Sequence, residues 1–412
     1  MSSQQANLIE GGGAPKMSFM QNLQKVIRLN IRDYGMYIAL AVIMLFFTVQ
    51  TNGLFLSPRN ISNLLNQTGY IAVLAVGMTL VIVIRHIDLS VGFLSGFLAA
   101  LATIGMTQYH LPWYVVIPLA LALGVLAGFL TAYLVAQVGI PAFVATLGGW
   151  LWYRGLLLLV LASSGTIIIA DEAFNAIGNG FIPDIFPAES TFLPERHKLT
   201  LLLGLAFIIF FIISQVNSRR QKQAYSFEVL PTSLFILKLF FLTIVFGLIT
   251  WVLAGYNGLS WTVVIMLIVV AIYHFMTTQT VLGRHIYAIG GNPEAAQLSG
   301  INVKRITWFV FGSMGMLAAL GGIMFASRLR SATPTAGTLL ELDCIAAAFI
   351  GGASPAGGIG TIMGSLIGAL VYMSLTSGMN LMGTDIALQY VVRGLVLVLA
   401  VVFDVVTRKS AR

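Results

Sequence analysis

Residues 68–84 read Thr-Gly-Tyr-Ile-Ala-Val-Leu-Ala-Val-Gly-Met-Thr-Leu-Val-Ile-Val-Ile and contain no charged side chain. A helix that crosses the hydrocarbon core of a bilayer needs roughly 20 mostly apolar residues. Comparable apolar runs recur at about 35–50, 90–107, 113–136, 141–163, 198–215, 234–253, 259–276, 305–326, 358–378 and 386–404. The sequence therefore predicts an all-α, polytopic integral membrane protein.

The composition supports this class and excludes others. Of the 412 residues, 58% are hydrophobic and 9% are charged, with a mean hydropathy of +0.93. Globular domains are about 45–50% apolar and about 25% charged, so a water-soluble enzyme is excluded. The single cysteine, Cys344, rules out an intrachain disulfide and a multi-cysteine metal site. The net charge of +8 fits positively charged cytoplasmic loops, so no nucleic-acid partner is expected.

The distribution of charge predicts which loops face the cytoplasm. Basic side chains gather in the tail before Tyr34, at 219–222, at 284–305 and at 408–412. The loop 164–197 is instead acidic. It contains one arginine, Arg196, and five acidic residues, Asp171, Glu172, Asp184, Glu189 and Glu195. Cytoplasmic loops are enriched in Lys and Arg, so we place the acidic loop outside and both termini in the cytoplasm.

The first 33 residues form a predicted cytoplasmic tail, followed by a membrane domain over 34–412. Within the tail, residues 17–32 carry apolar side chains at helical spacing with basic side chains elsewhere on the helix. This pattern predicts a short amphipathic helix on the membrane surface. A plain extension of the first span explains the pattern equally well.

Counting crossings reveals a broken helix. The run 344–352 would be roughly 14 Å long as a helix and cannot cross alone. A cytoplasmic C-terminus nevertheless requires a crossing here, which gives about 12 hydrophobic segments in total. The irregular stretch 351–358, Gly-Gly-Ala-Ser-Pro-Ala-Gly-Gly, would complete it. Such backbone needs protein or water around it at membrane depth, and it often lines the substrate path of transporters.

A second interruption at 85–92 reads Arg-His-Ile-Asp-Leu-Ser-Val-Gly and hints at a duplicated unit. Asp88 either caps the following helix or faces the substrate path, because ionisable groups at membrane depth are functional candidates. The candidate pathway residues are Asp88, Ser90, Gly92, Ser354, Gly357 and Gly358.

Two arginines lie inside predicted spans. Arg154 and Arg393 each cost several kcal/mol to bury, about 2.5–3.5 on insertion scales, so each needs a partner or water. We interpret both as structural charges, paired with carbonyl groups. No matching set of intramembrane Asp or Glu residues is evident from the pattern, which argues against a proton-driven carrier.

The cytoplasmic loop 282–304 contains the signals of a short helix. Asn292 suits the N-cap, Pro293 the first helical position, and Glu294 the positive helix end. The helix would continue through Ala295, Ala296, Gln297 and Leu298 and stop at Ser299 and Gly300. A helix of about two turns is not stable alone, so something must pack on it. It is either a docking element or an ordinary connector.

Residues 283–303, Gly-Arg-His-Ile-Tyr-Ala-Ile-Gly-Gly-Asn-Pro-Glu-Ala-Ala-Gln-Leu-Ser-Gly-Ile-Asn-Val, resemble the cytoplasmic loop of permeases in the ribose/xylose group of sugar ABC importers. Residues 87–92 resemble the first-half motif of that family. Residues 341–347 and 356–358 resemble its second-half motif. The resemblance runs from about Tyr34 to the end, and three motifs in order are strongly specific.

Two features depart from the ribose-type pattern. About 199–253 contributes two extra spans, and this longer form is most similar to the xylose members of the group. Arg85 and His86 stand where relatives commonly have glycine, so the resemblance does not predict the backbone conformation at these two residues.

The resemblance implies the permease subunit of an ATP-driven importer of a monosaccharide, such as the pentose D-xylose, in the bacterial inner membrane. It implies a permease homodimer, ATP-binding subunits docked on 292–300, and a periplasmic sugar-binding protein. The chain has no Gly-Lys dipeptide and thus no phosphate-binding loop, so we expect no catalytic residue, bound cofactor or metal. ATP and Mg would be used by the partner. Alternatives are a permease for another sugar, a nucleoside, an autoinducer or a branched-chain amino acid, an ion-coupled secondary sugar carrier, or a channel.

Overall fold

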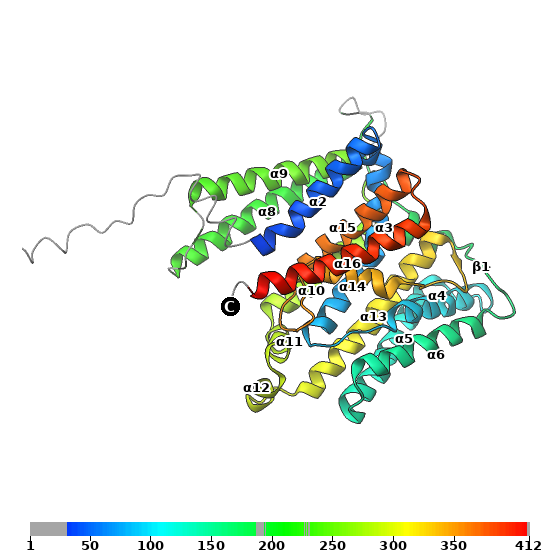
Figure 1. The fold of residues 1–412 in the computed structure, drawn as a ribbon. Coiled ribbons are helices and arrows are strands. Elements are labelled where there is room, and N and C mark those ends of the chain that lie inside the picture. The colour runs from blue at the N-terminus through cyan, green and yellow to red at the C-terminus, as the bar shows by residue number, and fades with distance from the viewer. Residues whose placement is uncertain are drawn as a thin grey trace, which may run out of the picture.

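The computed structural model describes residues 31–186, 193, 195–225, 227, 229 and 231–409. These residues form a helical bundle with one short strand pair (Figure 1). The helices are α2 Ile31–Gln50, α3 Pro58–Val83, α4 Val91–Thr107, α5 Trp113–Tyr133, α6 Ala142–Val160, α7 Glu172–Asn179, α8 Lys198–Ala224, α9 Thr232–Ala254, α10 Trp261–Gln279, α11 Val281–Gly291, α12 Pro293–Leu298, α13 Val303–Leu329, α14 Leu340–Ile350, α15 Ile362–Leu381 and α16 Ile386–Lys409.

The shorter elements complete this order. A 3-10 turn, Leu54–Leu56, precedes α3, and a π-helical segment, Leu134–Val138, continues α5. The strands are β1 Ile167–Ile168 and β2 Ser331–Ala332, which pair antiparallel.

In the described residues, eight helices are long and apolar enough to cross a bilayer. There are also three shorter apolar helical stretches, Gly35–Gln50, Val91–Thr107 and Ile386–Val402. Each of the eleven long apolar runs of the sequence overlaps a helix, and α14 occupies the predicted short segment. The prediction of an all-α polytopic membrane protein is therefore confirmed.

The helices divide into a buried interior and an outer layer. The most apolar windows of α3, α15 and α13 are 89%, 83% and 78% buried, whereas those of α8 and α9 are 6% buried. The interior helices approach closely through glycine. A Cβ atom on Gly128 of α5 would lie 2.1 Å from the carbonyl oxygen of Phe311 on α13, as small-residue packing in lipid requires.

The two ends of the bundle are distinct. In Figure 1, α11, α12 and the C-terminal end of α16 lie at one end, and β1 lies at the opposite end. The strand pair joins Ile167 to Ala332 and Ile168 to Ser331. The described basic residues near α11, α12 and the end of α16 thus lie away from β1 of the acidic loop, as positively charged cytoplasmic loops predict.

Helices α8 and α9 form a hairpin that leaves and rejoins the bundle at one place. The backbone N–H of Ile182 donates to Leu259 at 2.9 Å, and that of Trp261 donates to Gly180 at 3.2 Å. The two ends of the segment 183–258 therefore lie next to each other. The hairpin helices pack against each other at the edge of the bundle (Figure 1).

Three boundaries differ from the sequence prediction. Helix α3 begins at Pro58 rather than near 68, because Ser57 caps it and accepts the N–H of Asn60 at 3.4 Å. Helix α2 already begins at Ile31, inside the predicted tail, while residues 1–30 and most of the predicted amphipathic helix lie outside the described residues. The third difference is α11, which replaces part of the predicted loop.

Gly283 lies within the predicted loop, but in the structure it is part of the first turn of α11. The hydroxyl of Thr280 accepts the Gly283 N–H at 3.2 Å and so starts a new helix. Helix α12 is consequently packed against α11 and α13 rather than isolated, and Ala296 is buried.

Candidate functional site

Two interruptions of the helical bundle meet in space. The first interruption, residues 84–90, separates α3 from α4, and the second interruption, residues 351–361, separates α14 from α15. The backbone N–H of Gly358 donates to the carbonyl of Val83 at 2.9 Å. Gly357 and Gly358 have φ values of +81° and +73°, which glycine adopts without strain. The two predicted breaks are therefore in direct contact.

Helix α11 covers this meeting point. A Cβ atom on Gly290 would lie 2.0 Å from the oxygen of Val83 and 2.5 Å from the nitrogen of Gly358, so only glycine fits. The hydroxyl of Tyr287 donates to the carbonyl of Gly360 at 2.6 Å. Burial raises the pKa of the Tyr287 phenol, which keeps the hydroxyl a donor. The cytoplasmic loop and both interruptions thus form one junction.

Asp88 holds the start of α4. Its carboxylate accepts the backbone N–H of Ser90 at 2.9 Å and the hydroxyl of the same residue at 2.6 Å. Asp88 and Ser90 are both buried. The N-cap residue of α4 is Ser90, so Asp88 holds the residue before the first turn and does not itself cap that turn. A role of Asp88 and Ser90 in the substrate path stays a prediction.

Helices α4 and α14 begin face to face. A Cβ atom on Gly92 would lie 1.9 Å from Oε2 of Glu341 and 2.6 Å from the carbonyl oxygen of Gly337. Glu341 lies in the first turn of α14 and is only 4% exposed. Its Oε1 accepts the indole N–H of Trp150 at 3.0 Å, while Oε2 has no hydrogen-bond partner among the described residues. The positive ends of two helices therefore surround one buried carboxylate.

The eight candidate spans and the three shorter apolar helices of the described residues contain no Asp or Glu, but three acidic side chains lie at or just before helix starts within the bundle. Besides Asp88 and Glu341, Asp343 lies in the first turn of α14 and accepts the hydroxyl of Tyr372. Glu341 and Asp343 were visible at the start of the predicted short helix. They were missed because the sequence does not show that this helix begins inside the bundle.

Among the described residues, the two intramembrane arginines contact aromatic rings, and the predicted pairing with carbonyl groups is not found there. The guanidinium of Arg154 lies 5.1 Å from the ring centre of Phe93 and 5.9 Å from that of Trp150. Arg393 lies 5.7 Å from the ring centre of Tyr372, whose hydroxyl binds Asp343. Aromatic faces attract cations, so these contacts stabilise both guanidinium groups.

The remaining pathway candidates divide between two places. Ser354 is fully buried in the turn of the second interruption, where its N–H donates to Ile359 at 2.9 Å. Gly357 and Gly358 lie beside α11, whereas Asp88 and Gly92 lie beside α14. The six residues thus lie in the two interruptions and in the first turn of α4.

Helix α12 has the predicted cap. The side-chain oxygen of Asn292 accepts the N–H groups of Glu294 at 3.0 Å and Ala295 at 3.1 Å. Pro293 occupies the first helical position, and Gly300 follows the helix at φ +85°. The side chain of Leu298 is 90% exposed. A capped helix therefore presents an apolar side chain and a carboxylate to the outside.

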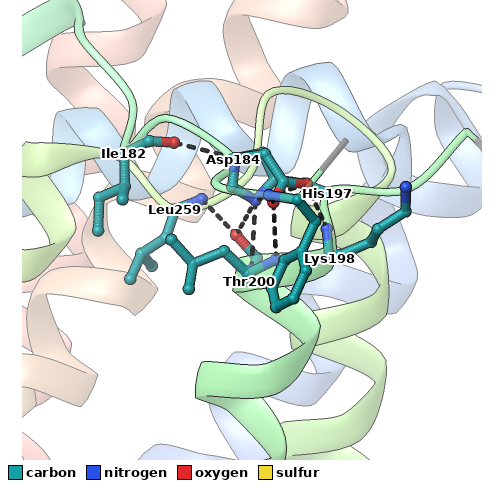
Figure 2. A network of polar contacts seen from close by, with 8 residues as sticks. Ile182, Asp184, His197, Lys198, Thr200 and Leu259 are labelled. Atoms are coloured by element: carbon teal, nitrogen blue, oxygen red, sulfur yellow. Dashed lines mark hydrogen bonds and ion pairs between the residues drawn. The ribbon is translucent and has the colours of Figure 1, made fainter. Parts of the chain in front are cut away.

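A polar network holds the α8–α9 hairpin at the start of α8, where the hairpin joins the bundle (Figure 2). Nδ1 of His197 accepts from the Thr200 backbone N–H at 3.2 Å, so Nε2 carries the proton and donates to Ile182 at 2.9 Å. The Thr200 hydroxyl accepts the N–H of Leu259 at 3.0 Å. These contacts join the start of α8 to the two chain segments that bracket the hairpin.

Asp184 completes this network. Its carboxylate accepts the backbone N–H of Lys198 at 2.6 Å and that of Leu199 at 3.2 Å, at the positive end of α8. Burial alone would raise the pKa of Asp184, but these donors and the Phe186 N–H outweigh it and lower the pKa below its ordinary value.

Interrupted helices inside a bundle of membrane-spanning helices, joined to a capped helix at one end, define a membrane transport subunit. The chain belongs to the family described as branched-chain amino acid transport system / permease component, which it matches over residues 60–401. It is thus a multi-pass membrane permease of a bacterial ABC importer and is not itself the ATPase.

The chain is also similar to individual permeases whose transported sugar is named. The chain is 39% identical to the xylose transport system permease protein XylH of Haemophilus influenzae, over 94% of this chain and 99% of that protein. It is also 39% identical to the protein of the same name from Escherichia coli K12, over 93% and 94%. It is 34% identical to the ribose import permease protein RbsC of Haemophilus influenzae, over 89% and 91%. The resemblance to the ribose/xylose group is confirmed. No solved structure matches the chain.

Proposed function

We propose that this chain is the transmembrane permease of an ATP-driven importer that moves a pentose such as D-xylose from the periplasm to the cytoplasm. The observation that carries the substrate class is the 39% identity to two xylose permeases over nearly the whole chain, against 34% to a ribose permease.

In this proposal the chain crosses the bilayer twelve times, and α14 together with the second interruption forms one of the crossings. Both termini then lie in the cytoplasm. The end of α16 lies on the α12 side of the bundle in Figure 1, which supports this orientation. Asp88, Ser90 and Gly92 would border the path where α4 and α14 begin.

The energy for transport comes from a partner. The exposed Glu294 and Leu298 of α12 fit a docking surface for an ATP-binding subunit, which would hold ATP and Mg. The functional unit would contain two permease chains, two ATP-binding subunits and a periplasmic sugar-binding protein that delivers the ligand. The permease itself binds no cofactor in this scheme.

Proteoliposomes test the proposal. Uptake of labelled D-xylose is expected only with the ATP-binding subunit, the sugar-binding protein and Mg-ATP together. ATP hydrolysis by the purified permease alone would contradict it. Uptake driven by a proton or sodium gradient without ATP would favour the secondary carrier, and ATP-driven uptake of ribose or a nucleoside but not D-xylose would change the substrate.

A further inference from the structure

Arg85 has an unusual backbone and a long-range side-chain contact. Its φ is +67°, in the left-handed region that few residues other than glycine adopt. Its side chain leaves the first interruption and reaches α11. Nε donates to the carbonyl of Gly290 at 2.8 Å, and a terminal guanidinium nitrogen donates to that of Gly291 at 2.5 Å.

These two carbonyls are the last of α11, where helix oxygens lack intrahelical donors and carry a partial negative charge. An arginine fork supplies both hydrogen bonds and the complementary charge. Lysine can bind as a point charge but cannot reproduce the fork. Arg85 thus fastens the first interruption to the end of α11.

The second interruption is fastened to the same place. A Cβ atom on Gly357 would lie 2.3 Å from Cγ of Arg85, and Gly358 is hydrogen-bonded to Val83. Tyr287 of α11 binds Gly360 on the far side of the turn. Residues 83–85, 287–291 and 357–360 therefore form one tightly packed joint.

The joint continues directly into α12. Asn292 donates its N–H to Ala288 at the end of α11, and its side chain caps the start of α12. One residue thus separates the docking helix from the carbonyls that Arg85 binds. A displacement of α12 would therefore be passed directly to Gly290 and Gly291 at the end of α11.

We propose that Arg85 is a positioning residue that makes both interruptions move with α11 and α12 when the partner ATPase acts. The inference rests on the proposed ATP-driven function, which it deepens by naming the joint through which the stroke passes. A purely structural Arg85 would stabilise the fold without affecting how ATP and transport are linked.

The first test measures D-xylose transported per ATP hydrolysed in proteoliposomes. Arg85→Ala is expected to lower this ratio by about 5-fold or more, a typical size for a coupling between sites. Arg85→Lys should restore part of it, and Tyr287→Phe should lower it by a smaller factor. Arg220→Ala, on the exposed end of α8, is the matched control and should leave the ratio unchanged.

The second test needs no sugar. Hydrogen exchange of peptides covering 292–300 and 351–361 is followed in the complete transporter with and without Mg-ATP. The wild type should show an ATP-dependent change in both peptides, and Arg85→Ala only in the first. A merely structural role would alter 351–361 equally with and without ATP.

The outcomes separate the two proposals. A wild-type transport ratio together with an ATP-dependent change in 351–361 in Arg85→Ala would overturn the role of Arg85. If that variant does not accumulate, Arg85→Lys and Tyr287→Phe decide by the same two readouts. If wild type moves no D-xylose, the substrate proposal fails, while the exchange experiment still decides the role of Arg85.

Discussion

Gly92 of α4 and Glu341 of α14 lie so close that a Cβ atom on Gly92 would come within 1.9 Å of the carboxylate oxygen Oε2. We expect Gly92→Ala to destabilise the protein by about 1–3 kcal/mol, because the first turns of α4 and α14 must move apart to make room for the methyl group. Thermal unfolding in detergent measures this loss. Gly155→Ala is the matched control, since its Cβ atom would meet nothing within 4 Å. Equal stability of the two variants would contradict the contact.

The bond between Trp150 and Glu341 predicts a second effect. Trp150→Phe removes the 3.0 Å hydrogen bond and leaves the buried carboxylate without its indole donor, at a cost of about 1–3 kcal/mol. Glu341→Gln alone keeps an oxygen that can accept the indole N–H. Adding Glu341→Gln to Trp150→Phe should recover part of the loss, so the two changes should not add. Trp113→Phe, at a partly exposed position in α5, should cost little.

Reversing the charge of α12 should disrupt the partner rather than the fold. Glu294→Lys replaces a favourable charge at a helix N-terminus, worth about 0.3–1 kcal/mol, by an unfavourable one. We expect binding of the ATP-binding subunit to weaken by about 10-fold, which corresponds to ~1.4 kcal/mol. Pull-down and sugar-stimulated ATPase assays measure it.

Glu172→Lys is the matched control, because Glu172 is exposed in the first turn of α7 at the other end of the bundle. Normal accumulation and wild-type transport by Glu294→Lys would make α12 a connector only.

The lowered pKa of Asp184 predicts acid sensitivity of the hairpin anchor. The ordinary pKa of 3.8 applies in the unfolded chain, and the folded pKa lies below it. The stabilisation is therefore complete above pH 3.8 and is lost as pH falls through the folded pKa. Hydrogen exchange of the Lys198 and Leu199 amides, corrected for the intrinsic rate, should accelerate only in that acid range. Asp184→Asn should remove this pH dependence, and a flat wild-type profile would argue against the anchor.

Apolar runs predicted the spanning helices because a bilayer demands long uncharged helices whatever their packing. The cap of α12 was equally predictable, since Asn292, Pro293 and Glu294 act within one turn. Local signals also existed where the prediction failed. Ser57 and Pro58 mark the true start of α3, and Thr280 marks that of α11.

Contacts between distant segments were beyond reach. Nothing local relates Val83 to Gly358, or Arg85 to Gly290, because their proximity depends on how whole helices pack. The burial of Glu341 has the same origin. Only the placement of α14 against α4 puts this side chain inside.

The hydrogen-bonded closure between Gly180 and Trp261 has an evolutionary consequence. A segment whose two ends already touch can be gained or lost in a single insertion or deletion without rerouting the rest of the chain. Its largely unburied helices then need only remain apolar, so selection on their individual side chains is weak. Length variation among permeases of this kind should therefore concentrate in the stretch from 183 to 258, while the interior helices drift far more slowly.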